Sequence, residues 1–226
     1  MNTRLLSELP PRIARLPRNH AGYPIPWFVD RTTGPVDAPD FRIADQRKLY
    51  AAIRFRCCWM CAGTLRNQTL GLAASQYAYV IGPMCAVNRI SAEPPSHREC
   101  AIAAAKVCPF LTTPNMRRRP DLPDDTIQPD GEMILRNPGV TLVWITNTWQ
   151  MVPGHELWNV GEPAQVLWFR EGRPATRAEA LESIDSGMPI LRAKAEKEQA
   201  PARAFAELGR QYARALELLP AETAAE

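Results

Sequence analysis

The stretch Cys58-Trp-Met-Cys61 decides the fold of this chain when it is taken together with His97-Arg-Glu-Cys100, which follows after 35 intervening residues. Each stretch holds two metal-ligating side chains separated by two residues. Four thiolate and imidazole ligands are the usual complement of a structural zinc site, which is tetrahedral and has no open position. The spacing therefore predicts a Zn2+ site whose ligands are Cys58, Cys61, His97 and Cys100.

The remaining thiols leave the identity of the metal open. All six cysteines lie between Cys57 and Cys108. In an intracellular chain, cysteines gathered in this way are typical of metal ligands or free thiols rather than disulfides. Cys85 and Cys108 are therefore possible additional ligands. Iron, or an iron–sulfur cluster held by four of the six thiolates, is the alternative cofactor.

The local sequence around the ligands predicts how they come together. Cys58 and Cys61 belong to a tight knuckle, and Gly63 allows the backbone to turn there. Ser96 and Glu99 have the spacing of a capping box, which predicts a helix start. His97 and Cys100 would then lie one turn apart on one helix face. A knuckle and a helix start that share one metal predict a treble-clef-like centre.

The rest of the chain divides into segments of different composition. Residues 1–41 are extended and rich in proline, and residues 42–120 form the basic metal-binding region. A short strand is expected at 77–84 within the metal-binding region. Residues 121–174 hold a linker and antiparallel strands, with a strand expected at 139–149 and a hairpin of 155–160 with 164–169. Residues 175–226 are helical, beginning at a second capping box of Thr176 and Glu179. The predicted fold class is α+β, with a small antiparallel sheet and a helical C-terminus.

The net charge of +3 conceals an uneven distribution. Between Arg42 and Arg119 there are 12 lysines and arginines and 3 acidic residues, a net charge of +9, and the remaining residues carry −6. A basic surface concentrates polyanions such as nucleic acids, although it can also be a merely solvated face. The candidate nucleic-acid contacts are Arg117, Arg118 and Arg119, which would bind phosphates, together with Arg89 and with Trp59, which is expected to be exposed or half-exposed for base stacking.

The sequence predicts no membrane association. No apolar run approaches the length of a transmembrane helix, and the first residues, with Glu8 and several arginines, lack the pattern of a signal peptide. We therefore expect a cytoplasmic protein.

One part of the chain resembles a group of bacterial and phage proteins to which no activity is attached. The resemblance rests on Cys58-Trp-Met-Cys61, Gly82-Pro-Met-Cys-Ala-Val-Asn-Arg89, Glu93-Pro-Pro-Ser-His-Arg-Glu-Cys-Ala101 and Cys108-Pro-Phe-Leu111. It covers about 55 residues. Where that group has a glycine directly after the second knuckle cysteine, this chain has Ala62 followed by Gly63. The resemblance implies a family and no function.

Three functions are compatible with these features. The first is a zinc-stabilised protein that binds or processes nucleic acid. The second is a metalloenzyme that uses iron or an iron–sulfur cluster on a small molecule. The third is an adaptor that binds a protein partner through the helix expected at 201–218, whose apolar stripe could equally pack on the body. The chain has no phosphate-binding glycine loop, nucleophile elbow or dinucleotide fingerprint, and no catalytic residue is assigned.

Overall fold

The computed structural model describes residues 8–32, 38–41, 43–65, 76–113 and 139–222. It contains helices and antiparallel sheets, so the α+β class is confirmed. The helices are α2 (Pro11–Ala14), α3 (Gln46–Phe55), α4 (Pro83–Asn88), α5 (Arg98–Val107), α6 (Pro109–Thr112), α7 (Arg177–Asp185), α8 (Met188–Ala195) and α9 (Pro201–Glu217). The strands are β1 (Tyr77–Ile81), β2 (Ile90–Ser91), β3 (Thr141–Thr146), β4 (Gln150–Met151), β5 (Trp158–Asn159), β6 (Pro163–Arg170) and β7 (Arg173–Pro174).

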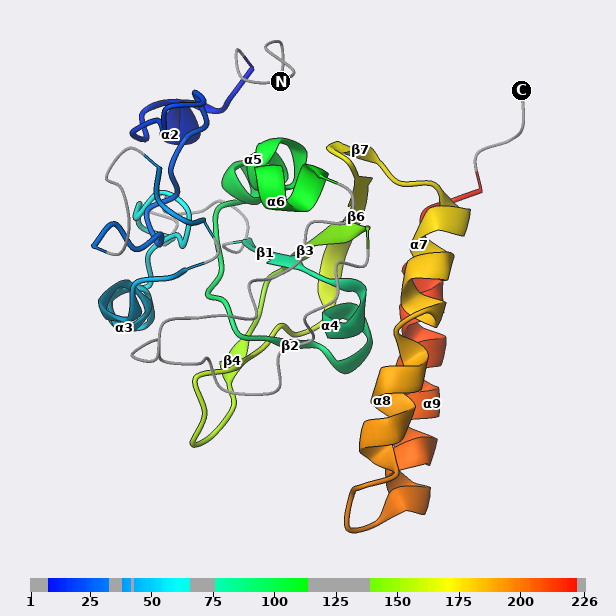
Figure 1. Ribbon diagram of the computed structural model, residues 1–226. Helices are drawn as coiled ribbons and strands as arrows, with labels where there is room; N and C mark the ends of the chain where they lie inside the picture. The colour runs from blue at the N-terminus through cyan, green and yellow to red at the C-terminus, as the bar shows by residue number, and fades with distance from the viewer. Residues whose placement is uncertain (1–7, 33–37, 42, 66–75, 114–138, 223–226) are drawn as a thin grey trace, which may run out of the picture.

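The larger sheet has the strand order β1-β3-β6-β7, and every neighbouring pair is antiparallel. Its central strand β3 is buried along its whole length because the sheet is covered on both faces. Helix α5 covers one face, where Ala101 and Ala105 pack with Val143 and Ile145 (Figure 1). The small alanine side chains let the helix axis approach the sheet closely, which fixes the position of the first turn of α5.

The opposite face of the sheet carries the larger side chains. Tyr79, Leu142, Trp144 and Trp168 belong to a continuous apolar core that also includes residues of α4, α7, α8 and α9. The indole Nε1 of Trp168 donates a hydrogen bond of 2.8 Å to the backbone oxygen of Leu218, which ties the end of α9 to β6. The sheet is thus a scaffold between α5 on one side and the C-terminal helices on the other.

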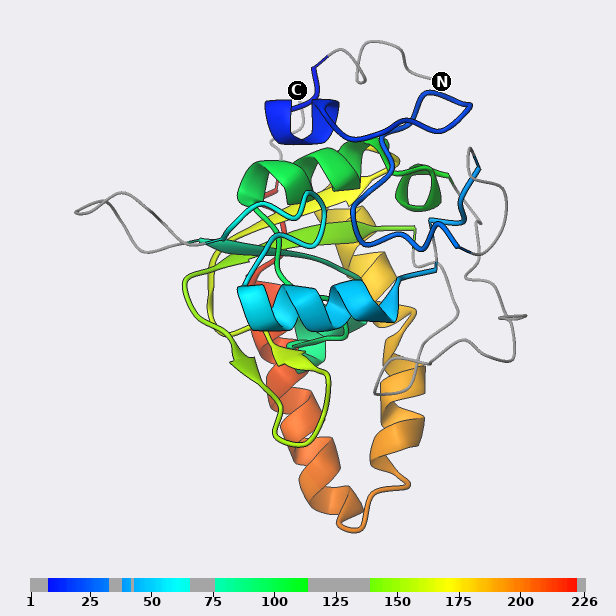
Figure 2. The ribbon, with the colours of Figure 1, turned by 90° about the vertical axis from the view of Figure 1, so that its left-hand side faces the viewer.

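The C-terminal helices form an arm that extends away from the sheet, with α8 and α9 side by side (Figures 1 and 2). The predicted capping box at the start of α7 is confirmed, because Thr176 and Glu179 each accept a hydrogen bond from the other's backbone. The apolar stripe of α9 packs against α4 and α8 through Leu208 and Ala215, and Phe205 stays exposed. Within the described ranges, no helix is long and apolar enough to span a membrane.

The predicted hairpin of 155–160 with 164–169 is wrong. Strand β5 pairs with β2 and β4 in a separate small sheet, whereas β6 pairs with β3 and β7. Gly161, at φ 65°, lies where the chain passes from one sheet to the other, and a Cβ there would fall 2.4 Å from the backbone oxygen of Thr148. Pairing with β3 places β6 inside the larger sheet, where Trp168 and Phe169 are buried.

Two other predictions from the sequence, the end of a strand and the start of a helix, differ from the structure. The strand expected at 77–84 ends at Ile81, because Pro83 starts the short helix α4 at a position that favours proline. The capping box expected at Ser96 is not formed: His97 is the N-cap of α5, and Ser96 instead exchanges two backbone hydrogen bonds with Ala78 of β1. The carboxylate of Glu99 lies 3.4 Å from Arg12 Nε.

Candidate metal centre

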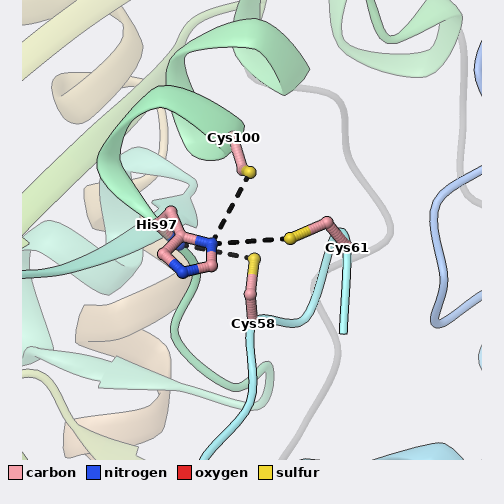
Figure 3. Close-up of side chains that lie close together, drawn as sticks. All are labelled: Cys58, Cys61, His97 and Cys100. Carbon is pink, nitrogen blue, oxygen red and sulfur yellow. Dashed lines mark hydrogen bonds between the residues drawn. The ribbon is translucent and has the colours of Figure 1, made fainter. Parts of the chain in front are cut away.

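The structure brings the four predicted ligands together. The Sγ atoms of Cys58, Cys61 and Cys100 and a ring nitrogen of His97 all lie within 4.8 Å of one another (Figure 3). Cys58 and Cys61 come from the turn after α3, whereas His97 and Cys100 come from the start of α5. Two chain segments that are distant in sequence therefore supply two candidate ligands each, and together they make the four that a structural zinc site uses.

The turn between the two knuckle cysteines is fixed by backbone hydrogen bonds. The N–H of Ala62 donates to the oxygen of Cys58 (2.9 Å), and the N–H of Cys58 donates to the oxygen of Gly63 (2.7 Å). Ala62 adopts φ 58°, in the left-handed region that costs a residue with a Cβ about 1 to 2 kcal/mol. The turn therefore needs the conformation for which glycine is best suited, and this chain reaches it with alanine.

Gly63 is required for a different reason, which is space. A Cβ at this position would lie 2.8 Å from Arg12 Nη1, 3.2 Å from Cε1 of His97 and 3.4 Å from Sγ of Cys61. The flexible Arg12 side chain can move, but the imidazole ring is held by its own contacts. Gly63 thus lets the knuckle backbone approach the histidine ligand.

The orientation of the His97 ring assigns its two nitrogens to different tasks. Nε2 lies 3.0 Å from the backbone oxygen of Thr64, an acceptor only, so this nitrogen carries the proton. Nδ1 faces the thiols, at 3.5 Å from Sγ of Cys61 and 3.8 Å from Sγ of Cys100. A metal-binding histidine typically donates its other N–H to a carbonyl in this manner, which fixes the tautomer and the ring plane. Nδ1 is therefore the nitrogen that could bind a metal.

The helix start contributes to the electrostatics of the site. Cys100 lies in the first turn of α5 and is fully buried, as is Cys58. The backbone N–H of His97 donates to Sγ of Cys58 at 3.4 Å. The N-terminal end of a helix favours negative charge, so the start of α5 and the N–H of His97 both favour the thiolate of Cys58.

The proton affinities of the ligands are strongly coupled. Burial disfavours the Cys58 thiolate, but hydrogen bonds from Cys100, Cys61 and His97 outweigh it and lower the pKa of Cys58 far below that of an ordinary thiol. The hydrogen bonds to Cys58 and Cys61 raise the pKa of His97 to about 10. Hydrogen bonds to Cys58 and Cys61, together with burial, raise the pKa of Cys100, so the four converging side chains share protons among them. The donor set fits a divalent metal, whose binding would displace the shared protons.

No protein-family model, curated protein or solved structure matches this chain.

Among the described residues, the three other cysteines stay outside the cluster. Cys57 precedes the first ligand and bridges Thr64 across the knuckle. Cys85 lies on α4, and Cys108 lies between α5 and α6. Burial raises the pKa of both Cys57 and Cys108, which keeps these thiols protonated. Cys57 is buried and Cys108 is partly buried, as is typical of cysteines that pack as small apolar groups.

The prediction that Trp59 is exposed for base stacking is wrong. Its side chain is only 2 % exposed. The ring stacks on Phe28 with 4.9 Å between centroids and meets Trp27 edge-on at 6.3 Å. The N-terminal segment folds over the knuckle, where the N–H of Trp27 donates to the oxygen of Met60, and this covers the indole. Trp59 is a core residue that supports the knuckle.

Arg89 is also less available than the sequence suggested. It is the C-cap of α4 at φ 59°, and its side chain is 15 % exposed. Its guanidinium pairs with Glu162 and lies 5.7 Å from the centre of the Trp144 ring. These contacts make Arg89 a link between α4 and the strands. Arg117, Arg118 and Arg119 lie outside the described residues.

Three exposed residues just before the knuckle were not predicted from the sequence. Arg54, Phe55 and Arg56 are all exposed at the end of α3, three positions or fewer before Cys57. The signal that could have revealed them is the alternation of arginine and an aromatic residue in Arg54-Phe-Arg56, next to the knuckle.

Proposed function

We propose that this chain is a zinc-stabilised protein that binds nucleic acid, with a treble-clef-like centre as its rigid core. The support for zinc is the chemistry of the donor set: three thiols and one imidazole nitrogen, with the histidine tautomer held by Thr64. This combination suits Zn2+ and other thiophilic metals and disfavours magnesium and calcium, which prefer oxygen ligands.

The observation that carries the nucleic-acid proposal is the position of the basic residues. The segment between Arg42 and Arg119 has a net charge of +9 and also contains the whole metal site. Helix α3, which leads directly into the knuckle, exposes Arg47, Arg54 and Arg56. A metal-fixed scaffold that presents exposed arginines suits phosphate contacts, which position a protein on nucleic acid independently of its sequence. Arg117, Arg118 and Arg119 are proposed as further phosphate contacts.

The test is the salt dependence of binding. Labelled single-stranded and duplex oligonucleotides are titrated with the zinc-loaded protein and followed by fluorescence anisotropy. Binding should weaken steeply between about 50 and 200 mM salt, because each phosphate contact releases a counterion. Reversing the charges at residues 117–119 should weaken binding to all sequences and flatten the salt dependence. Absence of binding at about 50 mM salt, or a salt-independent affinity, contradicts the proposal.

Removing the metal provides a second arm of the test. A chelator should abolish binding, and zinc should restore it, since the knuckle and the start of α5 are held together by the shared ligands. Binding that survives chelation, with the metal shown to be absent, would separate the basic surface from the metal centre and refute the link between them.

A further inference from the structure

Five residues near the metal centre form what we call the arginine–aromatic surface: Arg54, Phe55, Arg56, Tyr77 and Trp149. The guanidinium of Arg54 lies 5.8 Å from the centre of the Phe55 ring, and that of Arg56 lies 6.0 Å from the Trp149 ring. Trp149 meets Tyr77 edge-on at 6.0 Å. Charged and aromatic groups therefore alternate from the end of α3 to the start of β1 and the segment after β3.

The aromatic rings of this surface are accessible. Phe55 is 65 % exposed, and among the described residues the only other exposed large apolar side chains are Tyr50, also on α3, and Phe205 on α9. Tyr77 and Trp149 are partly exposed. Accessible aromatic rings thus lie beside the knuckle, where they could pack against a ligand with flat apolar faces.

Arg54 and Arg56 give this surface a positive charge. Within the described part of the chain, neither Arg54 nor Arg56 makes an ion pair with a carboxylate. The nearby acidic groups lie toward the other end of α3: Asp45 is the N-cap and pairs with Arg47, and Glu156 accepts a hydrogen bond from Gln46. The C-terminal end of α3 therefore attracts anions.

The backbone of the knuckle holds this surface in place. Arg56 is the C-cap of α3 at φ 49°, and its backbone oxygen accepts a hydrogen bond from the N–H of Leu65 across the knuckle. The next residue, Cys57, bridges Thr64, whose oxygen orients the ligand His97. The direction in which Phe55 and Arg56 point thus depends on the turn that the metal would close.

We infer that the arginine–aromatic surface binds single-stranded nucleic acid, with bases stacked on the exposed rings and phosphates paired with the arginines. This inference rests on the proposed function and makes it more specific. In a duplex each base face is stacked on the neighbouring bases, so an exposed aromatic side chain cannot stack on it. In a single strand the base faces are available to stack on an aromatic ring. Each base that stacks on an aromatic ring adds to the affinity, and the contribution does not depend on a particular base sequence.

The experiment compares an oligothymidine and an oligouridine of about 20 nucleotides with a duplex of equal length, using the zinc-loaded full chain. The wild type should bind both single strands more tightly than the duplex. Phe55→Ala should weaken single-strand binding about fivefold or more, because it removes one stacking surface. Arg54→Gln with Arg56→Gln should lower the salt slope by about 1.4, since each contact contributes about 0.7 for single strands.

The matched control lies on the arm: Arg203→Gln with Phe205→Ala removes an exposed arginine and an exposed aromatic ring on α9, away from α3 (Figure 1). This variant should bind like the wild type. Oligothymidine should also quench the fluorescence of Trp149, and the quenching should be reduced in Trp149→Phe.

The outcomes separate the two proposals. If the wild type binds nucleic acid and Phe55→Ala and the arginine variant bind equally well, the arginine–aromatic surface is refuted while the proposed function stands. Tighter binding to duplex than to either single strand also refutes this inference alone. If none of the three probes binds at about 50 mM salt, both proposals fail together.

Discussion

Replacing Ala62 with glycine tests the knuckle geometry, and it should stabilise the protein although it removes a methyl group. Ala62 is held at φ 58°, where a Cβ costs about 1 to 2 kcal/mol. Glycine removes that cost but gains about 0.4 to 1 kcal/mol of conformational entropy in the unfolded chain. The expected net gain in the free energy of unfolding is therefore about 0.5 to 1 kcal/mol. A domain of this size would melt about 2 °C higher.

The assay is urea unfolding of the zinc-saturated protein, followed by circular dichroism. The control is Ala213→Gly, at an exposed position inside α9, where the same change should destabilise by about 1 kcal/mol because the helix loses propensity. Opposite signs for the two variants support the left-handed knuckle. Destabilisation by Ala62→Gly of the size seen for Ala213→Gly would refute it, because Ala62 would then have an ordinary helical or extended backbone.

Two further predictions follow from the residues around the site and the arm. Gly63→Ala should weaken zinc affinity on the order of tenfold, because the added Cβ would press on the His97 ring. Competition with a chromogenic chelator measures the affinity. An unchanged affinity would contradict the close approach of the knuckle backbone to His97. In the α7 capping box, the Arg173 guanidinium and the Thr176 N–H lower the pKa of Glu179 to about 2 from its ordinary value of 4.5. Its contribution, about 1 kcal/mol at neutral pH, is therefore present above pH 4.5 and lost as the pH falls toward 2. Glu179→Gln should be less stable than the wild type at neutral pH by that amount, and the difference should shrink to nothing near pH 2; a difference that persists there would contradict the assignment.

The ligand set could be predicted from the sequence because it depends on short spacings. Two residues between Cys58 and Cys61 suit a knuckle, and two between His97 and Cys100 suit one helical turn, so each pair converges whatever the rest of the chain does. The capping box at Thr176 and Glu179 was predictable for the same reason, since all its hydrogen bonds are local.

The errors fall where distant segments decide the outcome. Ser96 fits a capping box locally, but β1 takes its backbone groups as a bridge partner, and the helix starts one residue later. Trp59 lies in a tight turn, where exposure is usual, yet the segment containing Trp27 and Phe28 folds over it. A local pattern contains no information about which remote segment will cover it.

The pairing of β5 and β6 shows the same limit of local patterns. The sequences of β5 and β6 each read as a strand, and their separation by a short turn favours a hairpin. Because β3 is buried, the backbone N–H and C=O groups on both of its edges need hydrogen-bond partners, and β6 supplies them on one edge. The hydrogen bonds that the distant strand β3 needs therefore decide the pairing of β6, and the short turn after β5 does not.

The measurement that tests the central claim most directly is elemental analysis of the purified protein with its visible absorption spectrum, repeated for Cys100→Ser and Cys108→Ser. The account predicts about one zinc per chain and no colour in the wild type, as expected for a closed four-ligand site. Cys108→Ser should keep that zinc, because Cys108 lies outside the cluster, and Cys100→Ser should lose it or hold it far more weakly. Iron with charge-transfer bands, or a folded wild-type protein that retains no metal, would contradict the account.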